Sequence, residues 1–266
     1  MQSQEPLTVN VLVLPISQAT TETLTDLFFH HALLVFIQVG SKRVLCPVNG
    51  ELVGHADDLI IFPSGSMVTL ENRPVLGHNY RATGVCFPRQ MIDAVFPKQV
   101  SRREPIGIQH LPAARARFTQ VLTTLQATLA DSHLPAPIRQ HRLLEPLIWL
   151  KHHGINLTPD DDNNPLTQVR QLIETDLSHP WRSGEVASHF GMSEATMRRW
   201  LMGSGQGFSK ILQNTRLEHG LSLLQSTEIP ISGVALDCGF KAPAHFSESF
   251  KKRFGIKPSE IRKRAG

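Results

Sequence analysis

Two neighbouring arginines lie on one face of a short amphipathic segment. Met197, Trp200 and Leu201 follow helical spacing and are expected to face a core, which leaves Arg198 and Arg199 on the opposite face. A guanidinium carries paired N–H donors that match the two acceptors of guanine in a major groove, and also the oxygens of a phosphate. The alternative is that the arginines only solvate an exposed helix face. The polar face as a whole consists of Ala195, Thr196, Arg198 and Arg199.

A second polar face lies near the end of the chain. Phe246, Phe250 and Phe254 recur every four residues and are expected to be core, because the paired bases of a duplex offer aromatic rings nothing to stack on. The opposite face carries Ala244, Ser247, Glu248, Lys251 and Lys252. The lysines suit phosphates, and Ser247 and Glu248 are placed to reach base edges.

Both polar faces are preceded by the same local pattern. A helix carries an alanine, a glycine follows four residues later, and a second helix comes next; the pairs are Ala187 with Gly191 and Ala235 with Gly239. The small residue lets two steeply crossing helices approach, and the glycine supplies the left-handed backbone of the turn. This pattern predicts two helix-turn-helix motifs. The first motif, the connecting helix and the second motif are expected at about 184–202, 208–225 and 231–254.

A longer signature extends across the second half of this region. It consists of Arg216-Leu217, Leu223-Leu224, Val234-Ala235, Cys238-Gly239-Phe240, Phe246-Ser247, Phe250-Lys251-Lys252, Phe254-Gly255, Pro258-Ser259 and Arg262. With these residues, about a hundred positions resemble the DNA-binding module of the AraC/XylS family of bacterial transcription regulators. The resemblance implies two helix-turn-helix subdomains that present their second helices to successive major-groove segments on one face of DNA. It places the base-contacting positions at Ala195, Arg198, Arg199, Pro243, Ala244, Ser247 and Glu248.

Two residues depart from the family pattern. Glu248 stands where the family usually has arginine, so this helix either accepts a hydrogen bond from cytosine N4 or mainly positions the domain. Gly220 replaces the alanine common in the connecting helix. A glycine inside a helix is expected to cost up to about 1 kcal/mol of stability.

The charge is unevenly distributed over the 266 residues. Residues 166–266 hold 14 Lys and Arg against 9 Asp and Glu, whereas residues 1–165 hold 13 against 14. A basic C-terminal part joined to a neutral N-terminal part favours a polyanion as partner of the former only. No run of about 18 apolar residues and no signal pattern is present, so a cytoplasmic, nucleoid-associated protein is expected.

The N-terminal half contains short apolar runs separated by Gly, Pro and Asn, which is typical of an antiparallel barrel or jelly roll. Pro63 to Asn72 resembles the second cupin motif, but Val68 stands where cupin enzymes have a metal-binding histidine, and no H-x-H pair precedes it. Valine has no donor atom for a metal. The three cysteines form no CxxC pair and no metal-ligand spacing with histidine. We therefore expect a cupin-like barrel without a metal, a cofactor or catalytic residues.

The interior of this barrel is expected to be aliphatic and aromatic. Its candidate lining residues, and hence candidate effector-binding residues, are Leu34, Phe36, Ile60, Phe62, Val68 and Val85. The family resemblance implies either a small molecule inside the barrel or a regulatory protein on its surface. The apolar interior favours an apolar or amphipathic molecule.

Two amphipathic segments without internal glycine follow the barrel, at about 118–129 and 138–152. They either pack on the barrel or form the seam of a homodimer, for which the candidate residues are Phe118, Leu122, Leu125 and Leu129. A polar, turn-rich stretch then predicts a linker. The expected divisions are a sensor or dimerisation domain at 1–153, a linker at 154–165 and a DNA-binding domain at 166–265.

The sequence thus predicts an α+β two-domain chain. Its N-terminal part is a cupin-like antiparallel β-barrel with two following helices, and its C-terminal part is an all-α domain with two helix-turn-helix motifs. The expected function is sequence-specific regulation of transcription, with activation favoured over repression. The expected partners are double-stranded DNA and RNA polymerase. A cupin-type enzyme fused to a DNA-binding module is the alternative, and a DNA-repair methyl acceptor is a third, which the apolar settings of Cys46 and Cys86 disfavour.

Overall fold

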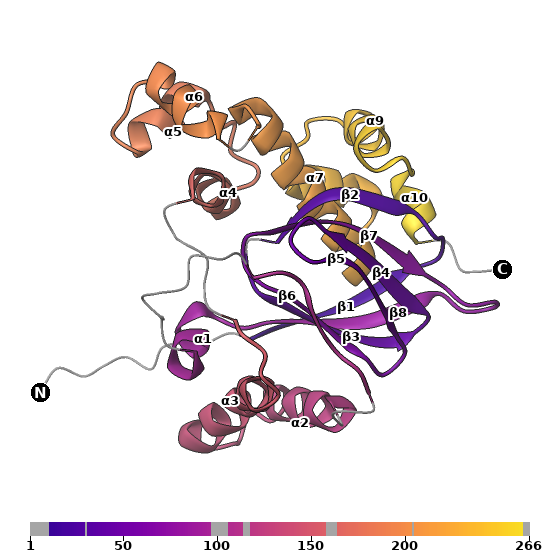
Figure 1. The fold of residues 1–266 in the computed structure, drawn as a ribbon. Helices are drawn as coiled ribbons and strands as arrows, with labels where there is room; N and C mark the ends of the chain where they lie inside the picture. The colour runs from indigo at the N-terminus through magenta and orange to yellow at the C-terminus, as the bar shows by residue number, and fades with distance from the viewer. Residues whose placement is uncertain are drawn as a thin grey trace, which may run out of the picture.

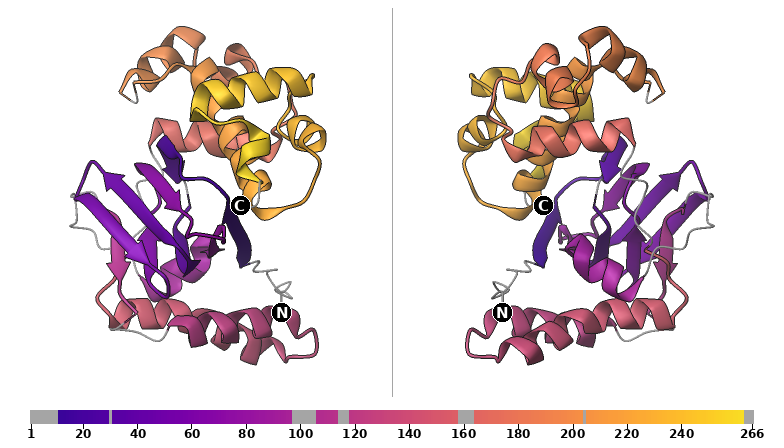
Figure 2. Two further views of the ribbon diagram at one scale, coloured as in Figure 1. Left: turned by 90° about the vertical axis from the view of Figure 1, so that its right-hand side faces the viewer. Right: turned by 90° about the vertical axis from the view of Figure 1, so that its left-hand side faces the viewer.

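The computed structural model describes residues 11–29, 31–96, 106–113, 118–157, 164–203 and 205–262. An antiparallel β domain and three helices form the N-terminal part, and an all-helical domain follows (Figure 1). Figure 2 shows helices α2 and α3 on one side of the strands and the C-terminal helices on the opposite side. The predicted two-domain α+β architecture is confirmed.

The strands of the described residues form two sheets rather than one closed cylinder. They are β1 (Leu12–Gln18), β2 (Thr23–Phe29), β3 (Leu33–Val39), β4 (Ser41–Cys46), β5 (Gly50–His55), β6 (Leu59–Phe62), β7 (Ser66–Arg73), β8 (Tyr80–Cys86) and β9 (Gln109–Leu111). The first sheet has the order β1-β8-β3-β6-β9, and the second has the order β2-β7-β4-β5. All pairings are antiparallel, as the short connections between most of the strands require.

The first sheet is buried on both of its faces. Because successive side chains of a strand point to opposite faces, Val35 and Ile37 of β3 pack toward the second sheet, while Leu34 and Phe36 pack against the helices on the other side. The predicted lining residues therefore separate. Ile60, Phe62 and Val68 lie in the core between the sheets, whereas Leu34, Phe36 and Val85 lie in the core under the helices. The expectation of one common interior was wrong for the latter three, since a continuous apolar run does not reveal which residue faces which side.

Strands β1 and β2 differ from their sequence predictions. Prolines were expected to separate the apolar runs, but β1 continues through Pro15, which an edge strand tolerates because its free side needs no N–H donor. Strand β2 was not among the sequence predictions, because Thr23, Thr25 and Asp26 interrupt its apolar residues, although Leu24, Leu27 and Phe28 are buried. Its pairing with β7 slips between Leu24 and Leu27, where Asp26 has a left-handed backbone with φ of 51°.

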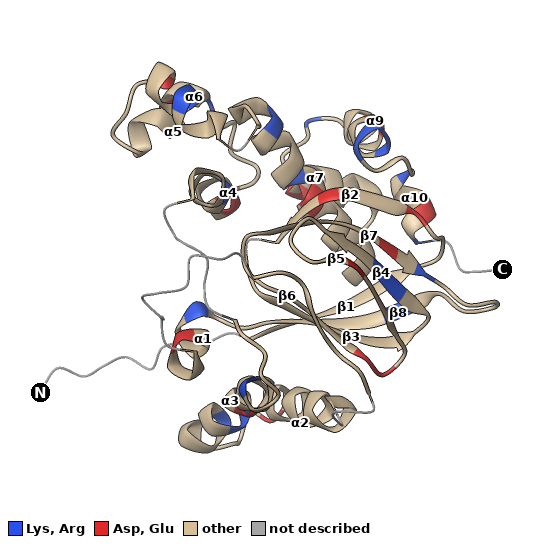
Figure 3. Ribbon diagram, viewed as in Figure 1, with Lys and Arg blue, Asp and Glu red and all other residues tan. Residues whose placement is uncertain are grey.

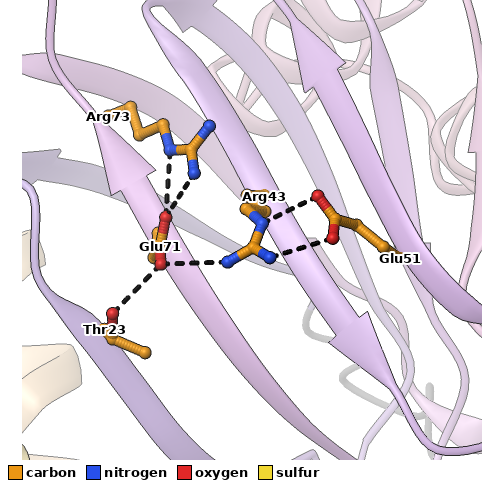
Figure 4. A network of polar contacts seen from close by, with 5 residues as sticks. All are labelled: Thr23, Arg43, Glu51, Glu71 and Arg73. Carbon is orange, nitrogen blue, oxygen red and sulfur yellow. Dashed lines mark hydrogen bonds and ion pairs between the residues drawn. The ribbon is translucent and has the colours of Figure 1, made fainter.

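A charged network covers the outer face of the second sheet (Figure 4). Arg43 donates two hydrogen bonds to Glu51, at 2.8 and 2.9 Å, and one to Glu71 at 3.2 Å. Glu71 also accepts hydrogen bonds from Arg73 at 2.6 Å and from Thr23 at 3.0 Å. The hydrogen bond from Arg73 is the largest cause that lowers the pKa of Glu71. The network joins side chains of β2, β7, β4 and β5 across the second sheet.

Three helices accompany the sheets: α1 (Arg89–Val95), α2 (Phe118–Ala130) and α3 (Ala136–His152). Helices α2 and α3 form an antiparallel pair against the first sheet. Phe118, Leu122 and Leu125 are buried in that core, with Leu129 partly buried at its edge. The apolar face that suggested a dimer seam is thus covered by the chain itself.

A buried polar chain links the space between the sheets to the C-terminal domain. The Lys42 amine donates to Asn72, Asn72 Nδ2 donates to Gln18 Oε1 at 2.9 Å, and Gln225 of the C-terminal domain donates to the same Gln18 oxygen at 3.0 Å. The Lys42 amine also lies 5.2 Å from the centre of the Tyr80 ring. Burial lowers the pKa of Lys42 to about 7.

The C-terminal domain consists of seven helices in the described residues. They are α4 (Pro165–Thr175), α5 (Ser183–His189), α6 (Glu194–Met202), α7 (Phe208–Ser226), α8 (Ile231–Asp237), α9 (Pro243–Phe254) and α10 (Pro258–Ile261). None of the helices in the described part of the chain is long and apolar enough to cross a bilayer. In the same residues, no three His, Cys, Asp or Glu side chains gather in a metal-binding arrangement.

Candidate nucleic-acid interface

Helices α5 and α6 form the first helix-turn-helix. Ala187 is buried at their crossing, and the turn closes where Met192 N–H donates to the Ala187 carbonyl at 2.9 Å. Gly191 adopts a left-handed backbone with φ of 65°, as the pattern predicted. Ser193 then caps α6, because its hydroxyl accepts the Thr196 N–H at 3.2 Å.

The outer face of α6 is free of the protein core. Met197 and Leu201 are buried, and this orientation exposes the set Ala195, Thr196, Arg198 and Arg199. The two guanidiniums make no ion pair within the described residues. Arg199 Nη2 donates a long hydrogen bond of 3.5 Å to Thr196 Oγ1 on the same face, and the other guanidinium donors are available to an external acceptor. The predicted face exists as an exposed surface.

Helices α8 and α9 repeat this arrangement. Ala235 is fully buried at the crossing, and Phe240 N–H donates to its carbonyl at 2.9 Å. Gly239 has φ of +74°, and a Cβ at this position would lie 2.3 Å from the Leu177 carbonyl oxygen and 2.8 Å from the Arg216 guanidinium. Glycine is required here both by backbone conformation and by space.

Helix α9 exposes the second predicted face. Phe246, Phe250 and Phe254 are buried and in ring contact, with centroids 5.5 and 4.7 Å apart, so they belong to the core as predicted. The opposite face carries the exposed Ala244, Glu248, Lys251 and Lys252 and the half-buried Ser247. Figure 3 shows Lys and Arg positions on α6, α7 and α9 of this domain.

The connecting helix α7 corrects the interpretation of Gly220. A Cβ on Gly220 would lie 2.8 Å from the Phe246 ring and 3.3 Å from Cys238 Sγ. The missing methyl group is what allows the Phe246 ring of the second recognition helix to pack directly on α7. The expected helix-propensity cost is thus accompanied by a packing role that the sequence did not reveal.

A buried charged cluster, formed by Arg170 of α4, Glu218 of α7 and Arg253 of α9, holds the helices together and attaches them to the N-terminal domain. Glu218 pairs with Arg170 at 2.5 Å and with Arg253 at 3.3 Å. Arg253 also donates to the carbonyls of Thr25 and Asp26 in β2, at 2.7 and 3.0 Å. Burial raises the pKa of Glu218, and the two guanidiniums oppose that shift. We call these three residues the Glu218 cluster.

The Arg170 guanidinium adds a second contact between the domains, since it lies 4.7 Å from the centre of the Phe28 ring in β2. No sequence pattern indicated this role of Arg253, because Arg253 directly follows two lysines that remain exposed on the same helix. Which of these three side chains reaches β2 depends on how α9 packs against that strand. Arg253 contacts β2, whereas Lys251 and Lys252 remain exposed.

Three further basic side chains near the turns were missed by the sequence analysis. Arg182, Lys241 and His245 are exposed and line a groove between the two helix-turn-helix motifs. Arg182 directly precedes α5, and Lys241 and His245 flank the start of α9. The signal available in the sequence was their position next to the start of a motif helix, which is α5 for Arg182 and α9 for Lys241 and His245.

Comparison with known proteins finds matches to the helix-turn-helix region of the chain. Residues 186–264 match a family model described as a helix-turn-helix domain. The DNA-binding dual transcriptional regulator Rns of Escherichia coli is 33% identical over 94 residues, which cover 35% of this chain and 36% of Rns. The HTH-type transcriptional regulator GadX of Escherichia coli O6:H1 is 28% identical over 102 residues, or 38% of this chain and 37% of GadX. The chain thus spans little more than a third of the length of these curated relatives.

A solved structure extends the similarity to the whole fold. The structure of wild-type ToxT from Vibrio cholerae bound to an unsaturated fatty acid superposes with a TM-score of 0.67 over 100% of both chains, at 14% sequence identity. At this identity the match shows a common fold. The C-terminal part of this chain is therefore a helix-turn-helix domain of the AraC type, carried by a chain with the two-domain fold of ToxT.

Proposed function

We propose that this chain is a sequence-specific DNA-binding transcription regulator that reads two adjacent major-groove segments. One observation carries the proposal: two helix-turn-helix motifs of the same build, at opposite ends of α7, each expose the polar face of their second helix. In such motifs the second helix lies in the major groove, and its N-terminal residues contact base edges. The matching relatives are transcription regulators, which supports the same function here.

The two recognition helices have different chemistry. In α6, Arg198 and Arg199 are donors suited to guanine, with Ala195 and Thr196 small enough to allow close approach. In α9, Glu248 offers acceptors suited to cytosine N4, with Ser247 and Ala244 beside it. Lys251 and Lys252 at the end of α9 are suited to phosphates. We assign most of the base discrimination to α6 and most of the positioning to α9.

Replacing Arg199 with alanine is expected to weaken binding to the preferred site by about 1–3 kcal/mol and to relax one base position. Selection of binding sites from a random duplex pool, followed by affinity measurement with wild type and variant, checks both effects. Arg142→Ala on the exposed face of α3 removes the same charge and is the matched control. If the Arg199 variant selects the wild-type sequence unchanged, Arg199 is not a reader.

The N-terminal domain is proposed to modulate this activity. The ligand present in the ToxT structure and the apolar core between the two sheets, which includes Ile60, Phe62 and Val68, favour an amphipathic small molecule over a protein effector. The buried amine of Lys42 in the same core is suited to an acidic head group. Native mass spectrometry of the purified chain distinguishes a bound small molecule from a protein partner.

We infer that the chain activates transcription, with RNA polymerase as its partner, in the cytoplasm at the nucleoid. A homodimer, if formed, would need a surface other than Phe118, Leu122 and Leu125, because these side chains are buried within the chain. We assign no catalytic activity, since Val68, which lacks a metal-binding atom, is buried where cupin enzymes have a histidine ligand.

A further inference from the structure

The groove between the two helix-turn-helix motifs has a volume of about 640 Å³. Its walls are the residues before α5, the first half of α7 and the turn between α8 and α9. It therefore touches both motifs and the helix that joins them. The lining residues that carry the argument are Arg182, Gln213, Arg216, Lys241 and His245.

The groove is basic, and no acidic side chain in its lining offsets the positive charge. Arg182, Arg216 and Lys241 contribute three positive charges, and the lining contains no Asp or Glu. Arg216 donates to the carbonyls of Leu177 and His179, at 2.9 and 2.7 Å, so its hydrogen bonds leave the charge in place. In the described part of the chain, Arg182 and Lys241 form no ion pair and no side-chain hydrogen bond.

One carboxylate lies close enough to act on Arg216 electrostatically, namely that of Asp176. Its oxygen is already engaged by the Ser178 hydroxyl at 2.6 Å and by the N–H groups of Ser178 and His179. Glu185 is paired with His179 at 2.8 Å. Glu194 of α6 accepts a hydrogen bond from the Ser183 hydroxyl at the groove wall. These carboxylates remain charged beside the groove, but the lining itself carries three cations and no carboxylate.

The position of the groove on the domain identifies the anion. If α6 and α9 enter successive major-groove segments on one face of a duplex, the surface between them faces the sugar–phosphate backbones that border the intervening minor groove. Lys241 and His245 sit at the N-terminal end of α9, the end that a recognition helix directs at DNA. The hydroxyl of Ser209 and the amide of Gln213 supply further donors in the groove, whereas the Ser183 hydroxyl already donates to Glu194.

We propose that this groove binds backbone phosphates of the DNA segment between the two major-groove contacts, with Arg182 on one wall and Lys241 on the other. This inference rests on the proposed DNA-binding function and goes beyond it. It assigns a contact to residues outside both recognition helices. Because phosphates carry no sequence information, the groove supplies affinity and register rather than specificity.

The test uses the full chain with the substitutions Arg182→Gln, Lys241→Gln and the double variant. Each single change is expected to weaken binding about three- to tenfold at 0.1 M salt, equally for the selected site and for random duplex. Each is also expected to reduce the slope of log K against log[salt] by about 1. The double variant combines both losses, Arg182→Lys keeps the wild-type slope, and Arg142→Gln on α3 is the charge-matched control.

The outcomes separate the possible failures. If the wild type binds no duplex in a salt-dependent way, both this inference and the proposed function are wrong. If the wild type binds and the double variant retains its slope, the groove assignment alone is overturned. Calorimetry with inorganic phosphate tests whether the groove is instead a site for a small anion. The groove assignment is also overturned if the wild type binds phosphate saturably, the double variant does not, and the salt slope of DNA binding is the same for both.

Discussion

Replacing Glu218 with glutamine is expected to lower the free energy of unfolding by about 3–5 kcal/mol, because it leaves two largely buried guanidiniums without their counter-charge. The side chains of Arg170 and Arg253 are 2% and 13% exposed, and both pair with this one carboxylate. Glutamine keeps the size of glutamate and can still donate or accept hydrogen bonds. The change therefore isolates the charge of the Glu218 cluster.

Urea unfolding followed by tryptophan fluorescence measures this loss, since Trp181 and Trp200 lie in the C-terminal domain. Glu228→Gln, at an exposed position after α7, is the matched control and should change stability by less than about 0.5 kcal/mol. A loss below about 1 kcal/mol for the Glu218 variant would mean that the cluster is not a significant source of stability.

Lys42→Met is expected to abolish a rise in stability with pH that the wild type shows. Burial lowers the pKa of Lys42 from its ordinary 10.5 to about 7 in the folded chain. Between these two values the unfolded chain binds more protons than the folded chain, so wild-type stability increases with pH by up to about 1.4 kcal/mol per unit. Below pH 7 both states are protonated, and this group adds no pH dependence.

The measurement compares the two chains at pH 6.5 and pH 9. The stability of the wild type relative to Lys42→Met should increase by about 2–3 kcal/mol between these conditions. Other groups that titrate in this range, such as Cys86 and Cys238, whose pKa values burial raises to about 11 and 12, are common to both chains and cancel. An identical pH dependence in both chains would show that Lys42 is not a buried amine.

The helix-turn-helix half was predictable because its signals are local. Ala187, Gly191, Ala235 and Gly239 each fix one turn through size or backbone conformation, and neighbouring apolar residues fix the helix faces. Gly220 could not be interpreted in the same way. Its partner Phe246 lies 26 positions away in the sequence, and nothing local signals that contact.

The N-terminal half was predicted less completely because pairing partners decide its structure. Strand β2, whose apolar residues are interrupted by Thr25 and Asp26, pairs with β7 across a register shift, and β1 accommodates Pro15 at the edge of its sheet. Leu34 and Phe36 were assigned to the wrong face because both faces of β3 are covered. Of the predicted linker at 154–165, residues 158–163 lie outside the described residues, and Pro165 is already the first residue of α4.

The contacts between the two halves suggest how one influences the other. Arg253 attaches the end of α9 to β2, and Gln225 attaches α7 to Gln18 of β1. A change in the sheets that moves β1 or β2 would therefore act directly on the connecting helix and on the second recognition helix. The coupling runs through physical contacts that the Glu218 variant is expected to weaken.

The most direct test of the central claim is the architecture of the DNA site that the full chain selects from a random duplex pool. Two recognition helices in successive major grooves predict two conserved blocks whose centres are separated by about one helical turn, or 10–10.5 base pairs. The block read by α6 should be the more selective, with guanine at the position that Arg199→Ala relaxes. Selection of a single short block, or no enrichment over random sequence, would contradict the account.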